Sequence, residues 1–292
     1  IKMNIGENGA INTTDPDQTF ITGTDPNNYI WYSGKLWRAV SIDPDDNSVK
    51  LVTQWNISVI PYNASGNTAF EGSNMEAWLN DTSVDGFLGN LREPEKFIKM
   101  DSVWNATLTT STSKPESTTM VTDAVGLLNI YEYTMSYSGT DYGNGYLNNG
   151  LYWWIITPYS AFNVWNVYYY GGASSDNPSN VLGVRPSINL KSSVRIVDGD
   201  GTIDNPYRLN GDNEKDLSGT MLNTRYSGEY IRFGTGENNL YRIVSHENGS
   251  GTKIVSAEPL KSSGTFITSA FGNNTAFSST NTVGSFLNND YL

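Results

Sequence analysis

The sequence LYWWIITPYSAFNVWNVYYYGGASSDNPSNVLGVRPSINL, residues 151–190, holds three of the eight tryptophans and five of the eighteen tyrosines. It begins with an apolar run that stops at Thr157-Pro158, and an alternating run follows over residues 163–169. A third extended run covers residues 181–190. Aromatic and β-branched residues bounded by Gly, Pro, Asn and Ser are typical of strands. We therefore expect three consecutive strands in an antiparallel meander at the centre of one domain, with a turn-rich loop over residues 171–180.

The composition favours a β-rich extracellular protein. Apolar residues make up 37% of the 292 residues and charged residues only 16%, and Asn, Ser, Thr, Gly and Tyr fill much of the rest. This length allows one large domain or two smaller ones with a hydrophobic core. The net charge of -12 argues against nucleic-acid binding, because the Lys and Arg residues form no basic stripe. No apolar run approaches the roughly 18–20 residues that cross a membrane.

The sequence contains no cysteine and one histidine, His246. The lack of cysteine excludes disulfides, thiolate metal sites and cysteine nucleophiles. A single histidine cannot build a His-based catalytic triad, a His-rich zinc site or a facial triad within this chain. We therefore expect a protein that is not an enzyme and has no cofactor and no metal site, with His246 in a solvated turn between strands.

Short strands and short helices are expected before and after residues 151–190. Residues 29–42 predict a β-hairpin around Ser33-Gly34. Ser73 and Glu76 have the spacing of a capping box, which predicts a helix over residues 73–80. The other expected elements are a strand over 49–54, a second short helix over 87–91, a buried strand that passes into a short helix over 125–133, and a closing hairpin over 194–209.

The beginning of this pattern recurs later in the chain. The matching pairs of segments are 229–233 with 28–32, 240–245 with 36–41, 253–255 with 50–52, 274–277 with 67–70, and 286–288 with 78–80. The offset between the copies drifts only from about 201 to about 208, which is the behaviour of a true repeat with small loop insertions.

The repeat divides the chain into four expected segments. Residues 1–23 are an N-terminal edge or linker segment, residues 24–209 a complete module, residues 210–221 a polar linker, and residues 222–292 the first part of a second module. This second copy has no counterpart of residues 151–190, and a module without its central strands should not bury its own core. We therefore expect that the polypeptide is longer than this sequence, as its start at Ile1 also suggests. The alternative is that another chain supplies the missing strands.

Five motifs, taken in order, resemble a group of bacterial modules. They are Trp37-Arg38, Val125–Leu128, Tyr152–Pro158, Gly183–Pro186 and Asp198–Tyr207. The ordered set is similar to Gram-positive surface and pilin-associated modules, which have a C-type-lectin-like fold and are distantly similar to formylglycine-generating enzymes. The resemblance covers residues 24–209, and its first third returns within residues 222–292. It implies an α+β fold class: a C-type-lectin-like domain of short helices and antiparallel sheets, followed by a partial second copy.

The resemblance implies less about activity. Formylglycine-generating enzymes need cysteines for their copper-dependent chemistry, and this chain has none. Sugar-binding lectins use a Glu-Pro-Asn or Gln-Pro-Asp calcium loop and a Trp-Asn-Asp strand, and neither stands in the matching region. We expect neither activity to carry over, because a shared fold does not establish a shared function.

The aromatic residues between the expected strands form the candidate ligand-binding site. Its expected residues are Tyr159, Phe162, Trp165, Tyr168, Tyr169, Tyr170 and Asn177. Exposed Tyr beside Ser, Gly and Asn is typical of adaptable binding surfaces, and aromatic faces also stack on sugars. The alternative is a Tyr-rich sheet surface without a ligand. In the resembled fold, this region also holds the variable residues of receptor-binding proteins that retroelements diversify.

Trp153 and Arg185 are expected to be structural. Arg185 lies between apolar residues, so we expect a partly buried side chain that donates hydrogen bonds to loop carbonyls or to a carboxylate. Asp198, Asp200 and Asp204 have the spacing of part of a calcium loop, but the terminal Glu of such a loop is missing. A plain turn is the favoured interpretation of this segment.

These expectations favour a non-catalytic bacterial cell-surface protein that serves adhesion or ligand binding. The expected partner is an extracellular protein or a glycan, and homotypic assembly through the incomplete second module is a further expectation. The alternative is a structural subunit of a surface fibre or pilus whose half-module another chain completes. A glycosidase is least supported. Its carboxylates would come from Glu71, Glu76, Glu132 and Asp141, and no pattern places two of them together.

Overall fold

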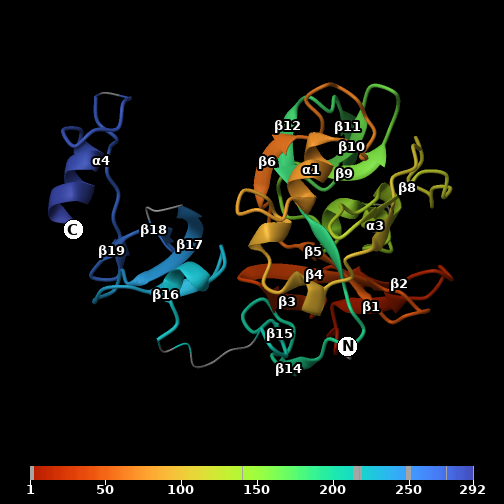
Figure 1. Ribbon diagram of the computed structural model, residues 1–292, viewed down its shortest axis with the longest axis horizontal. Helices are drawn as coiled ribbons and strands as arrows, with labels where there is room; N and C mark the ends of the chain where they lie inside the picture. Colours follow the sequence, from red (N-terminus) through yellow and green to blue (C-terminus); the bar gives the residue numbers. More distant parts are fainter. Residues whose placement is uncertain are drawn as a thin grey trace. The chain divides into compact units, whose positions relative to one another are not determined.

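The computed structural model describes residues 3–139, 141–212, 217, 219–247, 251–273 and 275–291 (Figure 1). The chain divides into two compact units, residues 1–227 and 228–292. Parts of the expected linker over residues 210–221 and of the expected match over residues 274–277 lie outside the described residues. Each unit is described by itself below.

The first unit is built mostly of β-strands with short helices between them. Its strands are β1 (Gly9–Asn12), β2 (Thr19–Gly23), β3 (Tyr29–Tyr32), β4 (Lys35–Ile42), β5 (Val49–Thr53), β6 (Ser58–Pro61), β7 (Ser102–Asn105), β8 (Met120–Asp123), β9 (Trp153–Pro158), β10 (Val164–Val167), β11 (Ala173–Asp176), β12 (Val181–Val184), β13 (Ser187–Leu190), β14 (Ile196–Asp198) and β15 (Tyr207–Leu209). Its helices are α1 (Asn74–Asn80), η1 (Leu88–Asn90), α2 (Pro94–Phe97), α3 (Ile130–Thr134), η2 (Tyr142–Asn144) and η3 (Leu222–Thr224). This is an α+β architecture, as predicted.

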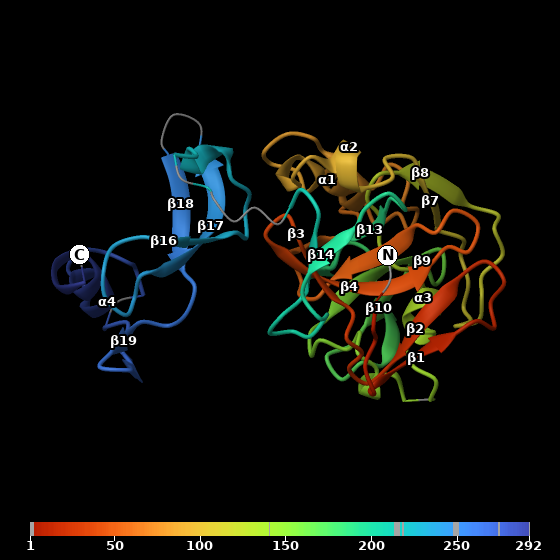
Figure 2. The same ribbon diagram turned by 90° about the horizontal axis from the view of Figure 1, so that it is seen from below.

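Two sheets form the body of the first unit (Figures 1 and 2). The larger sheet has the order β1-β2-β4-β3-β15-β14, and β5 also pairs with β4 and with β13. The second sheet has the order β11-β10-β9-β12-β6, and β7 and β8 form a separate hairpin. Among the described residues, no helix is long and apolar enough to cross a membrane.

Residues 151–190 build most of the second sheet, but the predicted simple meander is wrong. β9, β10 and β11 are antiparallel in succession, and β11 lies inside the segment expected as a loop. β12 lies parallel to β9 and antiparallel to β6. The third run splits at Arg185-Pro186, so that β13 joins β5 in the larger sheet. The split follows from Pro186, which has no backbone N–H to donate to a strand partner.

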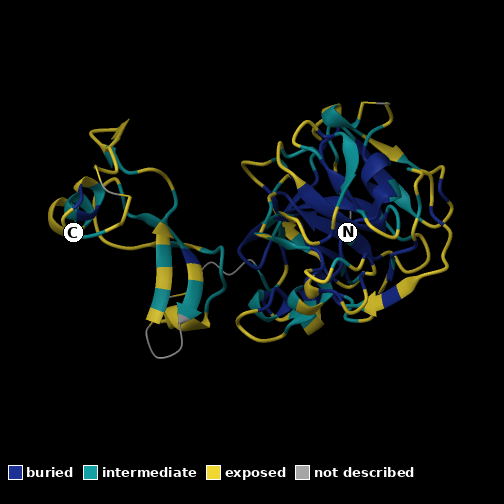
Figure 3. Cartoon of the chain, turned by 90° about the horizontal axis from the view of Figure 1, so that it is seen from above, coloured by how far each residue is buried: buried dark blue, intermediate teal, exposed yellow. Residues whose placement is uncertain are grey.

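Buried residues lie at the centre of the first unit (Figure 3). The central strands of the larger sheet, β2, β4 and β5, are buried on both faces. On β4, Ala39 belongs to one core cluster and its neighbour Val40 to the other. Because successive strand residues point to opposite faces, the two clusters lie on the two sides of this sheet. β9 connects them, since Trp154 packs in the first cluster and Trp153 in the second, and all six of its residues are buried.

The expected hairpin and first helix are confirmed. β3 and β4 pair across a turn in which Ser33 and Gly34 have φ values of 52° and 69°, as a two-residue hairpin turn requires. Helix α1 starts after Ser73, whose Oγ accepts a hydrogen bond from Glu76 N at 3.0 Å. The second expected helix is the short 3-10 helix η1.

The expected strand over residues 125–128 is wrong, although the helix after it is present. This segment makes a single bridge, between Gly126 and Ser187. Helix α3 then starts at a capping box, in which Asn129 Oδ1 accepts from Glu132 N and Glu132 Oε2 accepts from Asn129 N. The cap marks the start of α3.

The two ends of the first unit belong to the larger sheet. β1 lies at its edge, and Phe20 and Ile21 of β2 are fully buried, so residues 9–23 form an edge segment, one of the two alternatives expected for residues 1–23. The closing hairpin is present as β14 and β15. β15 also lies parallel to β3, with Tyr207 opposite Ile30.

Arg185 and Trp153 pack together in the core. Arg185 is fully buried, its Nε donates to the carbonyl of Thr53 at 2.8 Å, and its guanidinium carbon lies 4.5 Å from the centre of the Trp153 ring. The predicted hydrogen bonds to backbone carbonyls are therefore present. Burial lowers the pKa of Arg185 to about 9, which leaves it charged at neutral pH. Arg185 thus ties the β12–β13 connection to β5 and β9.

The second unit repeats part of the first. Its elements are β16 (Tyr230–Arg232), β17 (Leu240–Glu247), β18 (Gly251–Ser256), β19 (Lys261–Ser262), β20 (Thr265–Phe266), α4 (Thr282–Ser285) and the π-helix η4 (Phe286–Asp290). The sheet β16-β17-β18 corresponds to β3-β4-β5, and Asn281 caps α4 where Ser73 caps α1. His246 lies on β17, not in the expected turn, and its Nδ1 is 2.9 Å from Thr252 Oγ1.

The substitution Arg185→Ala tests the core assignment. It removes a stacked cation and leaves buried carbonyls without a donor, so we expect a loss of about 3 kcal/mol or more in the free energy of unfolding. Urea unfolding followed by tryptophan fluorescence measures the first unit alone, because all eight tryptophans precede residue 228. The exposed Arg195 provides the matched control, and Arg195→Ala should change the unfolding midpoint little. Equal effects of the two substitutions would contradict the assignment.

Candidate functional site

The structure places the predicted ligand-binding residues at opposite ends of β10. Tyr168–Tyr170 form the turn between β10 and β11, whereas Tyr159 and Phe162 lie in the turn between β9 and β10. Because Val164 pairs with Asp176, Asn177 follows β11 at the end that holds Phe162. The predicted residues therefore do not form one surface.

Trp165 is buried, so the expectation of an exposed ring is wrong at this position. Only 7% of the residue is exposed, its Nε1 donates to the carbonyl of Thr109 at 2.7 Å, and its ring meets Tyr159 edge-on at 4.9 Å. Thr109 N in turn donates to Pro158 O, which holds the connection between β7 and β8 against this sheet. The strand pattern could not show that a distant loop covers the face.

Four tyrosines gather at the other end of β10. We call Tyr152, Tyr168, Tyr169 and Tyr170 the tyrosine cluster. The ring centres of Tyr152 and Tyr168 are 4.7 Å apart, and those of Tyr169 and Tyr170 are 5.3 Å apart. Tyr152, Tyr169 and Tyr170 expose 38%, 55% and 58% of their surface. The cluster is thus a solvent-facing aromatic surface whose rings support one another.

The backbone beneath the tyrosine cluster is firmly held. Tyr168 N donates to Gly172 O, and Gly171 N donates to Tyr168 O, both at 2.8 Å. Gly171 has a φ of 86°, which favours glycine. The hydroxyl of the buried Tyr133, on α3, donates to Gly171 O at 2.6 Å. A rigid turn therefore presents the exposed rings, which limits the conformational entropy lost when a ligand binds.

Tyr152 is a member of the cluster that the sequence pattern did not include in the predicted site. Trp153 pairs with Val167, so the same antiparallel register sets Tyr152 beside Tyr168. The pairing of β9 with β10 was the signal that could have identified it. Desolvation and the neighbouring Tyr168 hydroxyl raise the pKa of Tyr152, so its hydroxyl stays a hydrogen-bond donor at neutral pH.

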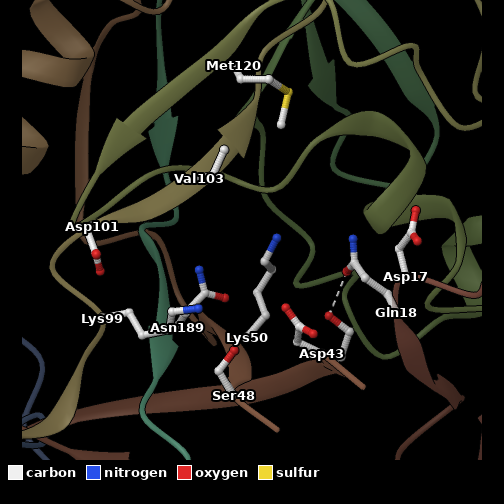
Figure 4. A pocket seen from close by; sticks show the side chains of 11 residues that line it. Asp17, Gln18, Asp43, Ser48, Lys50, Lys99, Asp101, Val103, Met120 and Asn189 are labelled. Atoms are coloured by element: carbon white, nitrogen blue, oxygen red, sulfur yellow. Dashed lines mark hydrogen bonds between the residues drawn. The ribbon is translucent and has the colours of Figure 1, made fainter. Parts of the chain in front are cut away.

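A polar cavity of about 360 Å³ lies elsewhere on the first unit (Figure 4). It is lined by Asp17, Gln18, Ser41, Asp43, Ser48, Lys50, Lys99, Asp101, Val103, Met120 and Asn189. Figure 4 shows Lys50 rising from the sheet toward the middle of this group, with Val103 and Met120 on the β7–β8 side.

The charge of Lys50, which lines the cavity, is matched within the chain. The Lys50 ammonium pairs with Glu132, whose side chain is 2% exposed, and lies 5.0 Å from the Trp104 ring centre. Glu132 also accepts from Gln18 at 3.2 Å, and Gln18 accepts from Ser41 at 2.8 Å. Glu132 is thus both an ion-pair partner and the capping residue of α3, and this network ties the helix to the sheet.

A carboxyl pair joins the start of α1 to the end of β8. Burial, together with the charge and hydrogen bond of Glu76 and the charge of Glu71, raises the pKa of Asp123 to about 7. The structure therefore places Glu71 and Glu76, which were named from the sequence, near Asp123, which was not. Glu132 lies in the Lys50 network, and Asp141 caps η2. The four carboxylates named from the sequence are therefore not gathered in one place, as a glycosidase would require.

The raised pKa of Asp123 predicts a pH-dependent stability. The folded protein favours the protonated form, so the stabilisation is full below pH ~4 and is lost as the pH rises through about 7. Asp123→Asn stays neutral, so at pH 8 it should unfold at a higher urea concentration than the parent, by an amount on the order of 1 kcal/mol, and this advantage should shrink at pH 4. Asp85→Asn, at an exposed aspartate, is the control. An effect of Asp123→Asn that is the same at both pH values would rule out this titration.

The three aspartates of the expected calcium-like spacing belong to the segment around the β14–β15 turn. Asp200 Oδ1 accepts from Thr202 N at 3.0 Å and from Thr202 Oγ1 at 2.7 Å, and these bonds lower the pKa of Asp200. Asp198 Oδ1 accepts from Gly199 N at 2.9 Å. In the part of the chain that the structure describes, no group of three or more Asp, Glu or His side chains is placed to hold a metal ion.

Comparison with known protein families finds a match over residues 46–192, to DUF6273, a domain of unknown function. This stretch covers half of the chain. The chain belongs to the DUF6273 family. The DUF6273 stretch contains the whole tyrosine cluster, Arg185 and β9, but it begins after β3 and β4. Searches of curated proteins and of solved structures find no match.

Proposed function

We propose that this protein is a non-catalytic bacterial cell-surface protein that binds an extracellular glycan through the tyrosine cluster. The observation that carries the proposal is the set of exposed, mutually packed rings on a rigid turn. Exposed aromatic faces stack on the apolar faces of sugar rings, and tyrosine hydroxyls offer hydrogen bonds to sugar hydroxyls. A host protein is the second ligand class that such a surface fits.

The proposal includes the finer fold and the location. A C-type-lectin-like fold and display outside a Gram-positive cell are supported by the ordered motifs between Trp37 and Tyr207, and by the lack of cysteine. Long loops between short strands are also where binding residues gather in many folds. An enzymatic role has less support, because the carboxylates named from the sequence lie apart, with Glu132 in the Lys50 network and Asp141 at the start of η2.

A second candidate function is that of a subunit in a surface fibre or pilus. The observation that favours it is the exposure of large apolar side chains in the second unit, where Phe233 and Phe277 expose 66% and 59% of their surface. Fibre subunits can complete an open sheet with a strand from a neighbour.

The double substitution Tyr169→Ala/Tyr170→Ala tests the binding proposal. Both residues are exposed, so the fold should stay intact while affinity for a bound glycan falls by at least about tenfold, as expected when aromatic anchors are removed. The measurement is titration against the glycans that the parent chain selects from an immobilised panel. Phe162→Ala is the matched control, because Phe162 is an exposed ring at the other end of β10.

Two results would overturn the binding proposal. One is the absence of binding to any glycan of the panel by the parent chain. The other is binding that survives the double substitution but is lost in Phe162→Ala, which would place the site in the β9–β10 turn. Binding to a panel of host-matrix proteins that depends on Tyr169 and Tyr170 would keep the site and replace the glycan by a protein ligand.

A further inference from the structure

The two units share not only a sequence pattern but also the register of their strands. Tyr29 pairs with Arg38 in the first unit, and their counterparts Tyr230 and Arg242 pair in the second. In each pair the guanidinium lies over the tyrosine ring, at 3.6 Å and 4.8 Å from its centre. These matched pairs show that β16 and β17 pair in the same way as β3 and β4.

The bulge in this sheet also recurs. The pairing of β4 with β5 shifts between Ala39 and Ser41, and that of β17 with β18 shifts between Ile243 and Ser245, at the corresponding positions. Lys50 and its counterpart Lys253 stand opposite these serines. A β-bulge bends a strand at a defined residue, so the two sheets bend at corresponding positions. The sheet of the second unit can therefore pair with the same kind of flanking strands as the sheet of the first.

In the first unit, one continuous segment covers both edges of the three strands. Residues 187–190 form β13, which pairs antiparallel with β5 and sets Ile188 opposite Leu51. Residues 207–209 form β15, which pairs parallel with β3. The segment 187–209 therefore pairs with both edges of the three strands. Its buried residues, such as Ile188 and Leu209, pack on the face of Ala39 and Leu51, whereas β9 and α3 cover the opposite face, which holds Val40 and Val52.

On the face that β9 and α3 cover in the first unit, two valines of the second unit are exposed. Val244 and Val255 expose 46% and 53% of their surface, whereas their counterparts Val40 and Val52 are fully buried. Among the described residues, the sheet of this unit has the order β16-β17-β18, so β16 and β18 are its edges. An exposed apolar sheet with open edges is a template for a further strand.

We propose that the sheet β16-β17-β18 is a docking surface for a polypeptide segment of the same repeat family, of the kind that residues 187–209 represent. Such a segment adds one strand antiparallel to β18 and another parallel to β16. Its apolar residues face Ile254, as Ile188 faces Leu51 in the first unit. The occupant is not a folded second copy of this chain. In such a copy, residues 187–209 would already be paired with β3 and β5 of the copy's own first unit.

A synthetic peptide of residues 187–209, labelled with a fluorophore, tests the proposal on the full chain. We expect saturable one-to-one binding by fluorescence anisotropy, with slower hydrogen exchange in β16 and β18 and unchanged tryptophan fluorescence. A peptide carrying Ile188→Pro should bind at least about tenfold more weakly, because proline removes a strand donor and fixes φ. A peptide of the same composition in scrambled order is the control.

The substitution Ile254→Asp tests the surface from the other side. It sets a carboxylate opposite Ile188 of the peptide and should also weaken binding at least about tenfold. Val84→Asp, at an exposed valine of the first unit, should leave binding unchanged. The peptide variants keep the test decisive if Ile254→Asp disturbs the second unit itself.

Three outcomes would overturn the proposal. The first is no saturable binding of the parent peptide. The second is equal binding of the parent, Ile188→Pro and scrambled peptides. The third is a chain that associates with itself by light scattering and dissociates in Ile254→Asp, since the occupant would then be a second copy.

Discussion

The fold depends on one constraint, namely that the strands β3, β4 and β5 carry apolar side chains on both faces. Ala39 and Val40, adjacent on β4, belong to different core clusters, so neither face of this sheet can meet water. Cover must come from distant parts of the chain, and β9, α3, β13 and β15 supply it in the first unit. The second unit has the same strands with the same register but lacks that cover among its described residues. The contrast between the units shows that β9, α3, β13 and β15 contribute the cover of this sheet.

Stability and recognition are separated in the first unit. Arg185, Trp153 and Glu132 are buried; Arg185 donates to Thr53 O and stacks on Trp153, and Glu132 pairs with Lys50. The tyrosine cluster lies at one end of β10, on a turn whose Gly171 carbonyl accepts a hydrogen bond from Tyr133. Buried polar groups thus fix the position of exposed rings without taking part in contacts with solvent. This arrangement suits a surface that binds, because the scaffold does not have to reorder.

Local signals in the sequence were sufficient where a few neighbouring residues decide the conformation. Ser33-Gly34 predicted the hairpin turn, Ser73 predicted the start of α1, and both are confirmed. Over residues 125–128 the apolar run predicted a strand, but the segment makes only the bridge between Gly126 and Ser187 before Asn129 caps α3. Of the candidate site, Tyr169 and Tyr170 were found by composition, whereas Tyr152 required the pairing of β9 with β10.

The sequence by itself determined the repeat and most of the short elements, because these follow from spacing between neighbours along the chain, and the resemblance implied the α+β class. Only the tertiary structure decided that Trp165 is buried, that residues 181–190 divide between two sheets, and that Glu76 meets Asp123. The physical reason is that alternation fixes which residues share a face of a strand, but not what lies against that face. Whether a face meets solvent or a covering segment depends on contacts between residues far apart in the chain, and a local pattern does not record them.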